Sequence, residues 1–384
     1  MPNITEIRCK QACTEIKNED LSSSWNLNLY RGCMHRCIYC FAIYSHDYLH
    51  EGGNYYDDIY VKVNIANQLE KQLSSPNWKG EPIGICGVTD CYQPLEAKYK
   101  LMPDILRVLI KHKNPCAILT KSDLILRDYD LIEELSRVTD VRINASITCI
   151  DNEIRKKIEP GAKSAADKFQ MLKEFSKTNV RTGVLHMPII PYITDRRENI
   201  EQLYANAANS SVNYIMSKVL YLRGKTKEMF FDSISREFPQ TIEPLKKLYQ
   251  NRNGEASKAY KNSLYKMVKE LKRKYRLSKK HRLNDNTTPL IPSQTEIKVI
   301  KKAAESYEQL SLFDTNTPKT YQPSPIPCRK QLVIKPVQHA PQALAELDLE
   351  SFAEIEMDST QSASTPTPVS LPLRKSSLAE LNKR

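Results

Sequence analysis

The chain has 384 residues, of which 40% are hydrophobic, and a formal net charge of +12. Ten cysteines are too few for a fold built on disulfides in a chain of this length. No run of eighteen apolar residues occurs, and the first twenty residues carry charges where a signal peptide has its apolar stretch. We therefore expect a cytoplasmic protein with one large domain and an appendage, or two domains.

Short apolar runs alternate with amphipathic segments between residues 25 and 220. Six apolar runs have the length of buried strands, at 25–30, 83–88, 116–120, 141–147, 182–187 and 212–220. The amphipathic segments could cross back over a sheet as helices, at 60–73, 100–112, 130–138, 166–177 and 199–209. Repeated strand and helix units predict parallel strands, arranged as a full or partial β/α barrel or as a doubly wound sheet.

The segment after residue 224 carries the whole charge imbalance. Residues 246–282 hold fourteen Lys and Arg against two Glu, and the rest of the chain is electrically balanced. Its apolar side chains recur at helical spacing, so one helix face should pack on the core: Tyr260, Leu264, Met267, Val268, Leu271 and Tyr275. The basic face either binds a polyanion such as nucleic acid or is a solvated surface.

These patterns divide the chain into four parts. An N-terminal extension (1–24) precedes the core barrel (25–224), and a basic helical extension (225–284) follows it. Residues 285–384 hold half of the 22 prolines and none of the 10 glycines. Such a composition predicts a mostly disordered tail.

Polar side chains follow the ends of successive predicted strands. The active sites of β/α barrels form at the carboxyl ends of the strands. We therefore expect these side chains to converge on one mouth: Thr89 and Asp90, then Thr120, Lys121 and Ser122, then Ser146 and Thr148, then His186 and finally Arg223.

The loop "LYRGCMHRCIYCFA" at residues 29–42 places Cys33, Cys37 and Cys40 within eight positions. This spacing allows one loop to direct three thiolates at a single iron–sulfur cluster. A cluster with three protein ligands keeps one iron open, and an open iron can bind a cofactor or substrate.

Zinc or purely structural cysteines are the alternative interpretation of this loop. A zinc site would pair the thiols with His35 or His46, but structural zinc sites usually combine two separated ligand pairs. Cys9 and Cys13 could supply a second pair, although they lie in a polar stretch. We favour the iron–sulfur cluster, with His35 and Arg36 as surface residues of the loop.

The cysteine loop, with Tyr39 before its last cysteine, resembles the radical S-adenosylmethionine (SAM) superfamily. Four further segments resemble its spore photoproduct lyase-like branch, which is also named for DNA repair photolyases: "GVTDCYQPLEAKYKLM", "ILTKSDLILRDYDLIEEL", "ASITCIDNEIRKKIEPGAKS" and "HMPIIPYITD". The similarity spans residues 5–245. It implies an α/β fold with a partial (β/α)6 barrel of the TIM type.

The resemblance also implies the cofactors. A 4Fe–4S cluster would be held by Cys33, Cys37 and Cys40, and SAM would bind its open iron. One electron from the reduced cluster would cleave SAM to methionine and a 5′-deoxyadenosyl radical, which abstracts a hydrogen atom from the substrate. Such chemistry implies an electron donor such as flavodoxin or ferredoxin.

Five residues match positions that contact SAM in the family. Lys121 and Ser146 match those that meet the SAM carboxylate, and Thr89 and Asp90 match those near its amino group. Tyr39 is expected against the adenine. The alternative for Lys121 and Asp90 is a structural ion pair at the barrel rim.

The sequence departs from the genuine lyases at the hydrogen-donating cysteine, which lies just ahead of the second-strand polar pair. Here Cys86 and Cys91 bracket Thr89 and Asp90, but neither has the matching spacing. Either could act as a hydrogen donor, or Cys86 could be a buried strand residue. Reversal of a thymine dimer is therefore in doubt.

The tail contains "QLSLF" at residues 309–313, which matches the pentapeptide that docks bacterial repair proteins on the DNA sliding clamp. The Gln309 amide would form a hydrogen bond, and Leu312 and Phe313 would fill an apolar pocket, with Leu310 adding contact beside Ser311. The alternative is a short helix end that packs on the barrel.

These observations favour a radical SAM enzyme of the lyase-like kind that acts on nucleic acid, with DNA as the preferred substrate. A radical SAM modifier of RNA or of a peptide is the alternative enzyme. An alternative of another class is a non-catalytic nucleic-acid-binding protein with a structural cluster or zinc.

Overall fold

The computed structural model describes residues 2–16, 25–46, 53–251 and 253–277. The tail at 285–384, with the pentapeptide at 309–313, lies outside the described residues. Among the helices of the described ranges, none is long and apolar enough to cross a membrane.

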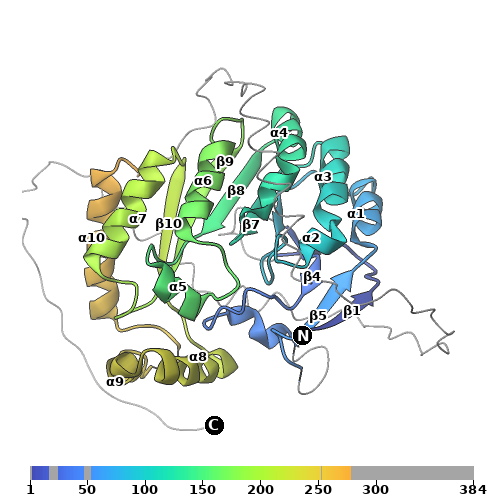
Figure 1. Cartoon of the computed structure of the whole chain (residues 1–384). Coiled ribbons are helices and arrows are strands. Elements are labelled where there is room, and N and C mark those ends of the chain that lie inside the picture. The colour runs from blue at the N-terminus through green and yellow to red at the C-terminus, as the bar shows by residue number, and fades with distance from the viewer. Residues whose placement is uncertain (1, 17–24, 47–52, 252, 278–384) are drawn as a thin grey trace, which may run out of the picture.

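A seven-stranded sheet forms the centre of the fold (Figure 1). From one edge to the other its strands are β10 (Tyr214–Val219), β9 (Arg181–Ile189), β8 (Val141–Ser146), β7 (Cys116–Thr120), β6 (Ile83–Ile85), β3 (Trp25–Leu27) and β2 (Cys13–Glu15). Neighbours from β3 to β10 are parallel, and β2 pairs antiparallel with β3. The six parallel strands are those that the apolar runs predict.

The order of the parallel strands decides between the two expected topologies. A doubly wound sheet reverses its strand order near the middle, whereas β3, β6, β7, β8, β9 and β10 follow one another in chain order. The fold is therefore the partial β/α barrel of the α/β class, open between β10 and β2 in the described part of the chain.

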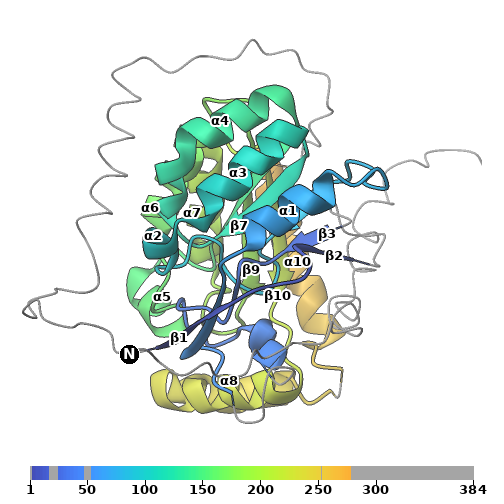
Figure 2. The same ribbon diagram turned by 90° about the vertical axis from the view of Figure 1, so that its right-hand side faces the viewer.

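Amphipathic helices cover the outer face of the sheet and enclose the core. They are α1 (Ile65–Leu73), α3 (Leu101–His112), α4 (Tyr129–Val138), α6 (Ala165–Phe175) and α7 (Arg197–Asn209). Figure 2 shows α1, α3 and α4 lying side by side, in agreement with their mutual contacts. Within α3, Met102, Ile105 and Leu109 recur at helical spacing and are fully buried. Burial of such apolar faces supplies most of the driving force for folding.

The expected helix at 60–73 is wrong at its beginning. Residues Asp58–Lys62 form the strand β5, which pairs with β1 (Asn3–Ile7) and β4 (Tyr30–Arg31) in a second, three-stranded sheet. In this strand Ile59 and Val61 alternate with more exposed residues and are completely buried. The period of two, with β-branched residues, is the strand signal that the helical pattern obscured.

Short elements complete the carboxyl ends of the parallel strands. They are η1 (Phe41–His46), α2 (Glu96–Tyr99), η2 (Asp123–Asp128) and α5 (Asn152–Ile158). The helix α8 (Gly224–Glu237), which follows β10, contacts η1 at this same end of the barrel (Figure 1). The mouth of the barrel is therefore bordered by η1, α5 and α8.

The basic helix α10 (Lys258–Lys274) follows η3 (Pro239–Thr241) and α9 (Ile242–Leu248). It packs on α7 and β10, at the flank of the barrel rather than at its mouth (Figure 1). Leu264, Val268 and Leu271 are its buried residues, as the helical spacing predicts. The ion pair between Arg197 and Glu270, with 2.6 Å between Nη2 and Oε1, joins α7 to α10.

Candidate active site

The cysteine loop lies between β4 and η1 and begins with a tight turn at Gly32. Gly32 has a φ of +83°, and a Cβ there would lie 2.7 Å from Ile59 Cδ1 and 2.8 Å from the carbonyl oxygen of Tyr55. The Cys33 amide donates to the same Tyr55 carbonyl at 3.3 Å. Only glycine fits this conformation and this close approach, so the sequence fixes where the loop begins.

The three thiols of the loop are enclosed by protein. Cys33 and Cys37 are buried, and Cys40 is half-buried. Burial raises the pKa of all three thiols, and the neighbouring Asp90 and Cys37 raise the pKa of Cys33 further. Thiols in such surroundings ionise when a cation compensates the charge, as iron or zinc does.

The donor set fits an iron–sulfur cluster better than a zinc ion. Cysteine thiolates are the usual ligands of such clusters. Both histidines considered for zinc have other neighbours: His46 Nε2 lies 2.7 Å from the carbonyl oxygen of Asp58, and the His35 ring lies between Gly161 and Asp90.

His35 is not a surface residue of the loop, and that expectation is wrong. Its side chain is buried, with 2% of the residue exposed. Its Nδ1 lies 2.8 Å from the Gly161 carbonyl oxygen, and its Nε2 lies 3.1 Å from Asp90 Oδ2. Arg36 does remain half-exposed and pairs with Asp57 at 2.6 Å.

Asp90 and Thr89 follow β6 and are both bound within the protein. Asp90 accepts hydrogen bonds from the Lys121 amide at 2.7 Å and from the Thr120 hydroxyl at 2.8 Å. Burial opposes ionisation of this carboxyl, but His35 and these donors hold its pKa below the ordinary value. The Thr89 hydroxyl donates to the Gly32 carbonyl at 2.7 Å. Both residues therefore support the cysteine loop.

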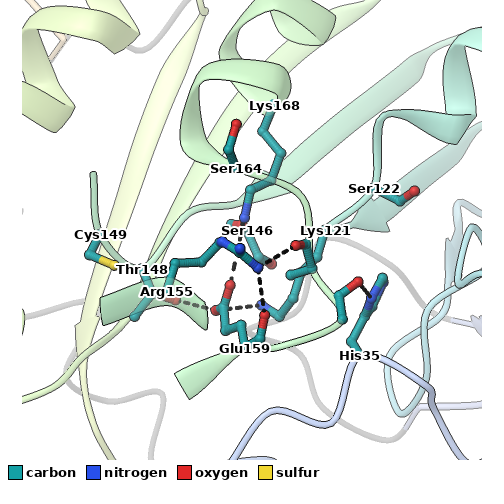
Figure 3. A network of polar contacts seen from close by, with 12 residues as sticks. His35, Lys121, Ser122, Ser146, Thr148, Cys149, Arg155, Glu159, Ser164 and Lys168 are labelled. Atoms are coloured by element: carbon teal, nitrogen blue, oxygen red, sulfur yellow. Dashed lines mark hydrogen bonds and ion pairs between the residues drawn. The ribbon is translucent and has the colours of Figure 1, made fainter. Parts of the chain in front are cut away.

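A buried carboxylate, Glu159, lies at the centre of the mouth (Figure 3). It follows α5, and its Oε1 accepts hydrogen bonds from the Tyr39 and Thr148 hydroxyls. The ammonium groups of Lys121 and Lys168 lie 3.5 Å and 3.6 Å from its two oxygens. Burial alone would raise the pKa of Glu159, but the two lysines and the two hydroxyls lower it to about 2.

The structure brings Lys121, Ser146 and Tyr39 together around this carboxylate. Lys121 Nζ lies 5.8 Å from the centre of the Tyr39 ring, and its side chain is 16% exposed. The Ser146 carbonyl at the end of β8 accepts a hydrogen bond from Lys168 Nζ at 2.9 Å (Figure 3). Lys121 pairs with Glu159, so the ion pair considered as the alternative role of Lys121 and Asp90 has a different acidic partner.

Sequence reasoning missed Glu159 and Lys168. Glu159 lies in the segment "IEPGAK", which belongs to the family resemblance but suggested no role for the glutamate. Lys168 lies in α6, where lysine at a helical position is usually solvated. Its side chain is instead buried between β8 and Glu159. A glutamate before Pro-Gly at the end of a short helix was the one available signal.

Cys86 and Cys91 are both buried near the end of β6. Cys86 has a φ of +69°, and the Cys91 thiol points at the Leu119 carbonyl oxygen, 3.8 Å away. Burial raises the pKa of Cys91, and a hydrogen bond with Cys86 adds to this effect. The two thiols are therefore neighbours, and a hydrogen-donor role for either stays a prediction.

His186 does not reach the mouth, contrary to the expectation from its position after the fifth strand. It lies within β9, fully buried, with its ring centre 6.0 Å from that of Tyr204 in α7. Burial, and next to it the charge of Lys272, lower its pKa to about 3, so the ring is neutral. It belongs to the layer between sheet and helices.

The helix α8 covers the cysteine loop. The Thr226 hydroxyl donates to the Cys40 carbonyl at 3.3 Å, and Met229 packs on the apolar cluster that includes Cys33 and Tyr55. At the other end of α8, Lys157 Nζ lies 3.8 Å from Glu237 Oε2. The basic helical extension therefore begins as a wall of the candidate site.

A partial barrel of parallel strands with three thiols and a lysine at its mouth defines a cofactor-binding α/β protein. Residues 27–204 match the Radical SAM superfamily. An uncharacterised protein of Mycobacterium tuberculosis is 31% identical over 280 residues, which cover 72% of this chain and 82% of that protein. An uncharacterised protein of Methanocaldococcus jannaschii is 27% identical over 217 residues, covering 56% of this chain and 77% of that protein.

Among solved structures, a double variant of spore photoproduct lyase with bound AdoMet and dinucleoside spore photoproduct has the same fold. Its TM-score is 0.53 at 14% identity, covering 71% of this chain and 79% of that chain. The chain belongs to the radical SAM superfamily. Proteins of this superfamily use a 4Fe–4S cluster and SAM, and these two are therefore the cofactors of this protein.

Proposed function

We propose that this radical SAM enzyme holds its 4Fe–4S cluster on Cys33, Cys37 and Cys40, and that its substrate is nucleic acid, most favourably DNA. The observation that carries the proposal is the position of the three enclosed thiols at the mouth of the barrel, where Lys121 lies close enough to act on Cys37 and Cys40 with its charge. The cluster and SAM together supply a 5′-deoxyadenosyl radical, which takes a hydrogen atom from the substrate.

The side chains at the mouth suit the methionine part of SAM, which carries a carboxylate and an ammonium group. Lys121 offers the SAM carboxylate a cation, and Ser146 lies at the end of the neighbouring strand. Tyr39 is proposed against the adenine. Asp90 and Thr89 are proposed near the amino group, where Asp90 adds a negative charge and both fix the cysteine loop.

The choice of nucleic acid rests on the basic face of α10. Clustered Lys and Arg bind phosphates by displacing counterions. The exposed basic residues of this helix and its end are Lys258, Lys266, Lys269, Arg273, Lys274 and Arg276. Lys274 is partly compensated by Glu201. Because α10 lies at the flank of the barrel, it would hold the phosphate backbone beside the mouth while an extruded base enters the site.

Anaerobic incubation with SAM, a reductant, and ultraviolet-damaged or undamaged DNA tests the proposal. We expect 5′-deoxyadenosine together with a changed nucleoside, and more of both with one of the two DNA samples. If 5′-deoxyadenosine forms but no nucleoside changes, the substrate is RNA or a peptide rather than DNA. The protein would instead be a non-catalytic binding protein if it holds zinc. The same would follow if it holds a cluster whose electron paramagnetic resonance (EPR) spectrum does not change when SAM is added.

Docking on the DNA sliding clamp is a second part of the proposal and rests on "QLSLF" alone. A peptide of residues 305–316 should bind the clamp, and Leu312→Ala with Phe313→Ala should remove binding of the whole protein. Unchanged binding in that double variant would exclude the motif.

Flavodoxin or ferredoxin is the proposed class of electron donor.

A further inference from the structure

Residues 158–163 lie along the cysteine loop and bind its backbone. The Ile38 amide donates to the Ile158 carbonyl at 3.0 Å, and the Gly161 amide donates to the His35 carbonyl at 3.1 Å. The His35 ring adds its contact with the Gly161 carbonyl at 2.8 Å. Residues 158–163 thus hold the loop at two places. One is His35, between the first two cysteines, and the other is Ile38, directly after the second cysteine.

Gly161 allows this close approach of two backbones. A Cβ at Gly161 would lie 2.4 Å from the Met34 carbonyl oxygen and 2.8 Å from His35 Cα. Contacts this short with backbone atoms cannot be relieved by turning a side chain. A side chain at position 161 would therefore push residues 158–163 away from the cysteine loop.

The same segment is also fixed to the strand end that carries Lys121. The Lys163 amide donates to the Lys121 carbonyl at 3.1 Å. The guanidinium of Arg155 donates to the Ala162 carbonyl at 2.6 Å and to the Glu159 carbonyl at 3.0 Å, which fixes the shape of the segment. Residues 158–163 therefore bridge two parts of the site that are more than eighty positions apart in the chain.

The Glu159 side chain also connects the cysteine loop with Lys121, through a hydrogen bond on one side and its negative charge on the other. Its Oε1 accepts a hydrogen bond from the Tyr39 hydroxyl of the cysteine loop. The same oxygen lies 3.5 Å from the Lys121 ammonium (Figure 3). Its Oε2 has Lys168 at 3.6 Å but no hydrogen bond within the described part of the chain. Two buried lysines thus share one carboxylate. Asp90 adds a second negative charge near Lys121, whose side chain is still 16% exposed at the mouth.

We propose that Glu159 is a positioning residue that couples the cluster loop to Lys121, so that the loop and the cation for the SAM carboxylate are held in one fixed arrangement. This inference rests on the proposed function of the same site. A carboxylate that merely stabilised the fold would have no specific influence on the cysteine loop or on SAM.

The first test uses Glu159→Gln, which keeps the shape and removes the charge, and Glu153→Gln as the matched control on the exposed side of α5. In cluster-free protein, hydrogen exchange of residues 33–42 should be faster in Glu159→Gln than in the wild type. Residues of α3, which packs between α1 and α4 on the outer face of the sheet, should exchange as before. The control should match the wild type throughout.

The second test uses the reconstituted protein. Titration of SAM against the EPR spectrum of the reduced cluster should show an affinity about tenfold or more weaker in Glu159→Gln, because the charge-assisted interaction that orients Lys121 is removed. The reduction potential of the cluster should rise, since a nearby negative charge is absent in this variant. Iron and sulfide content should remain that of the wild type.

Two further variants keep the inference testable if Glu159→Gln folds poorly. Glu159→Gln combined with Lys168→Met removes one charge of each sign, and should fold while still binding SAM weakly. Gly161→Ala leaves every charge in place but separates the backbones, and should also speed exchange in residues 33–42.

Unchanged loop exchange and unchanged or tighter SAM binding in Glu159→Gln would overturn the inference. If SAM has no effect on the cluster of the wild type, the proposed function fails instead. In that case the exchange experiment still decides whether Glu159 holds the loop, because it needs neither cluster nor SAM.

Discussion

The hydroxyl of Tyr39 donates a hydrogen bond to the carboxylate of Glu159, 120 positions further along the chain. Tyr39 lies between the second and third cysteines of the loop, and Glu159 directly follows the short helix after β8. One hydrogen bond therefore joins the proposed cluster loop to the pair of buried lysines. A substitution that displaces the loop should therefore also displace the lysines, and a substitution at the lysines should displace the loop.

Loss of one proposed cluster ligand should abolish the cluster. We expect Cys37→Ala to retain little iron or sulfide after anaerobic reconstitution, since two thiols of the loop cannot hold a 4Fe–4S cluster. Cys9→Ala, which removes a half-buried thiol near the N-terminus, is the control and should keep the full content. Reductive cleavage of SAM by Cys37→Ala would contradict the assignment.

Removal of the Lys121 ammonium should weaken SAM binding. Lys121→Met keeps the apolar stem but leaves the SAM carboxylate without its cation, so the dissociation constant should rise about tenfold to a hundredfold. Equilibrium binding to the reconstituted protein measures the change. Lys173→Met, on the exposed face of α6, should bind SAM like the wild type. Equal affinities in the two variants would remove Lys121 from the site.

Glu159 should make a contribution to stability that is lost in acid. Its pKa is about 2 in the folded protein against an ordinary value of 4.5, so the folded state binds fewer protons in this range. The contribution is present above the unfolded-state pKa and falls as the pH drops towards about 2, and its full size is about 3 kcal/mol.

Urea denaturation of cluster-free protein measures this effect. The difference in free energy of unfolding between the wild type and Glu159→Gln should shrink between about pH 6 and about pH 3. Glu153→Gln changes an exposed carboxyl, so its difference from the wild type should stay small throughout. A constant difference for Glu159→Gln across the range would show that its charge contributes nothing.

Charge reversal on α10 should weaken binding to DNA. Lys266→Glu, Lys269→Glu and Arg273→Glu together remove three exposed positive charges, and the slope of log affinity against log salt should fall by about 0.9 for each phosphate that is no longer neutralised. The control reverses Lys71, Lys98 and Lys113 around α1 to α3, across the molecule from α10 (Figure 1). Equal weakening in both triple variants would point to net charge alone.

Local pattern predicted most of the barrel. The apolar run at 116–120 coincides with β7, and that at 141–147 exceeds β8 by one residue. These strands are buried on both faces, so their composition is nearly independent of what packs on them. The strand β5 was missed because Lys62 and the polar residues after it continue a helix-like pattern. Its pairing with β1 is a contact between distant segments, which local pattern does not contain.

The candidate site divides in the same way. The cysteines were found because their ligand spacing is local to one loop, and Lys121 because it follows a strand that the pattern located. Glu159, Lys168 and the buried state of His35 were not found. Each depends on a partner at least 22 positions away, and a lone Glu, Lys or His carries no sign of such a partner.

The sequence by itself determined the parallel strands, the three thiols of one loop and the basic face of one helix, because each is a periodicity or a spacing along a single segment. Only the tertiary structure decided that Glu159 lies between two lysines and the cysteine loop, and that α10 lies at the flank rather than the mouth. Charges buried far from water must be paired in space. Their partners are therefore chosen by the packing of the strands and helices, and not by distance along the chain.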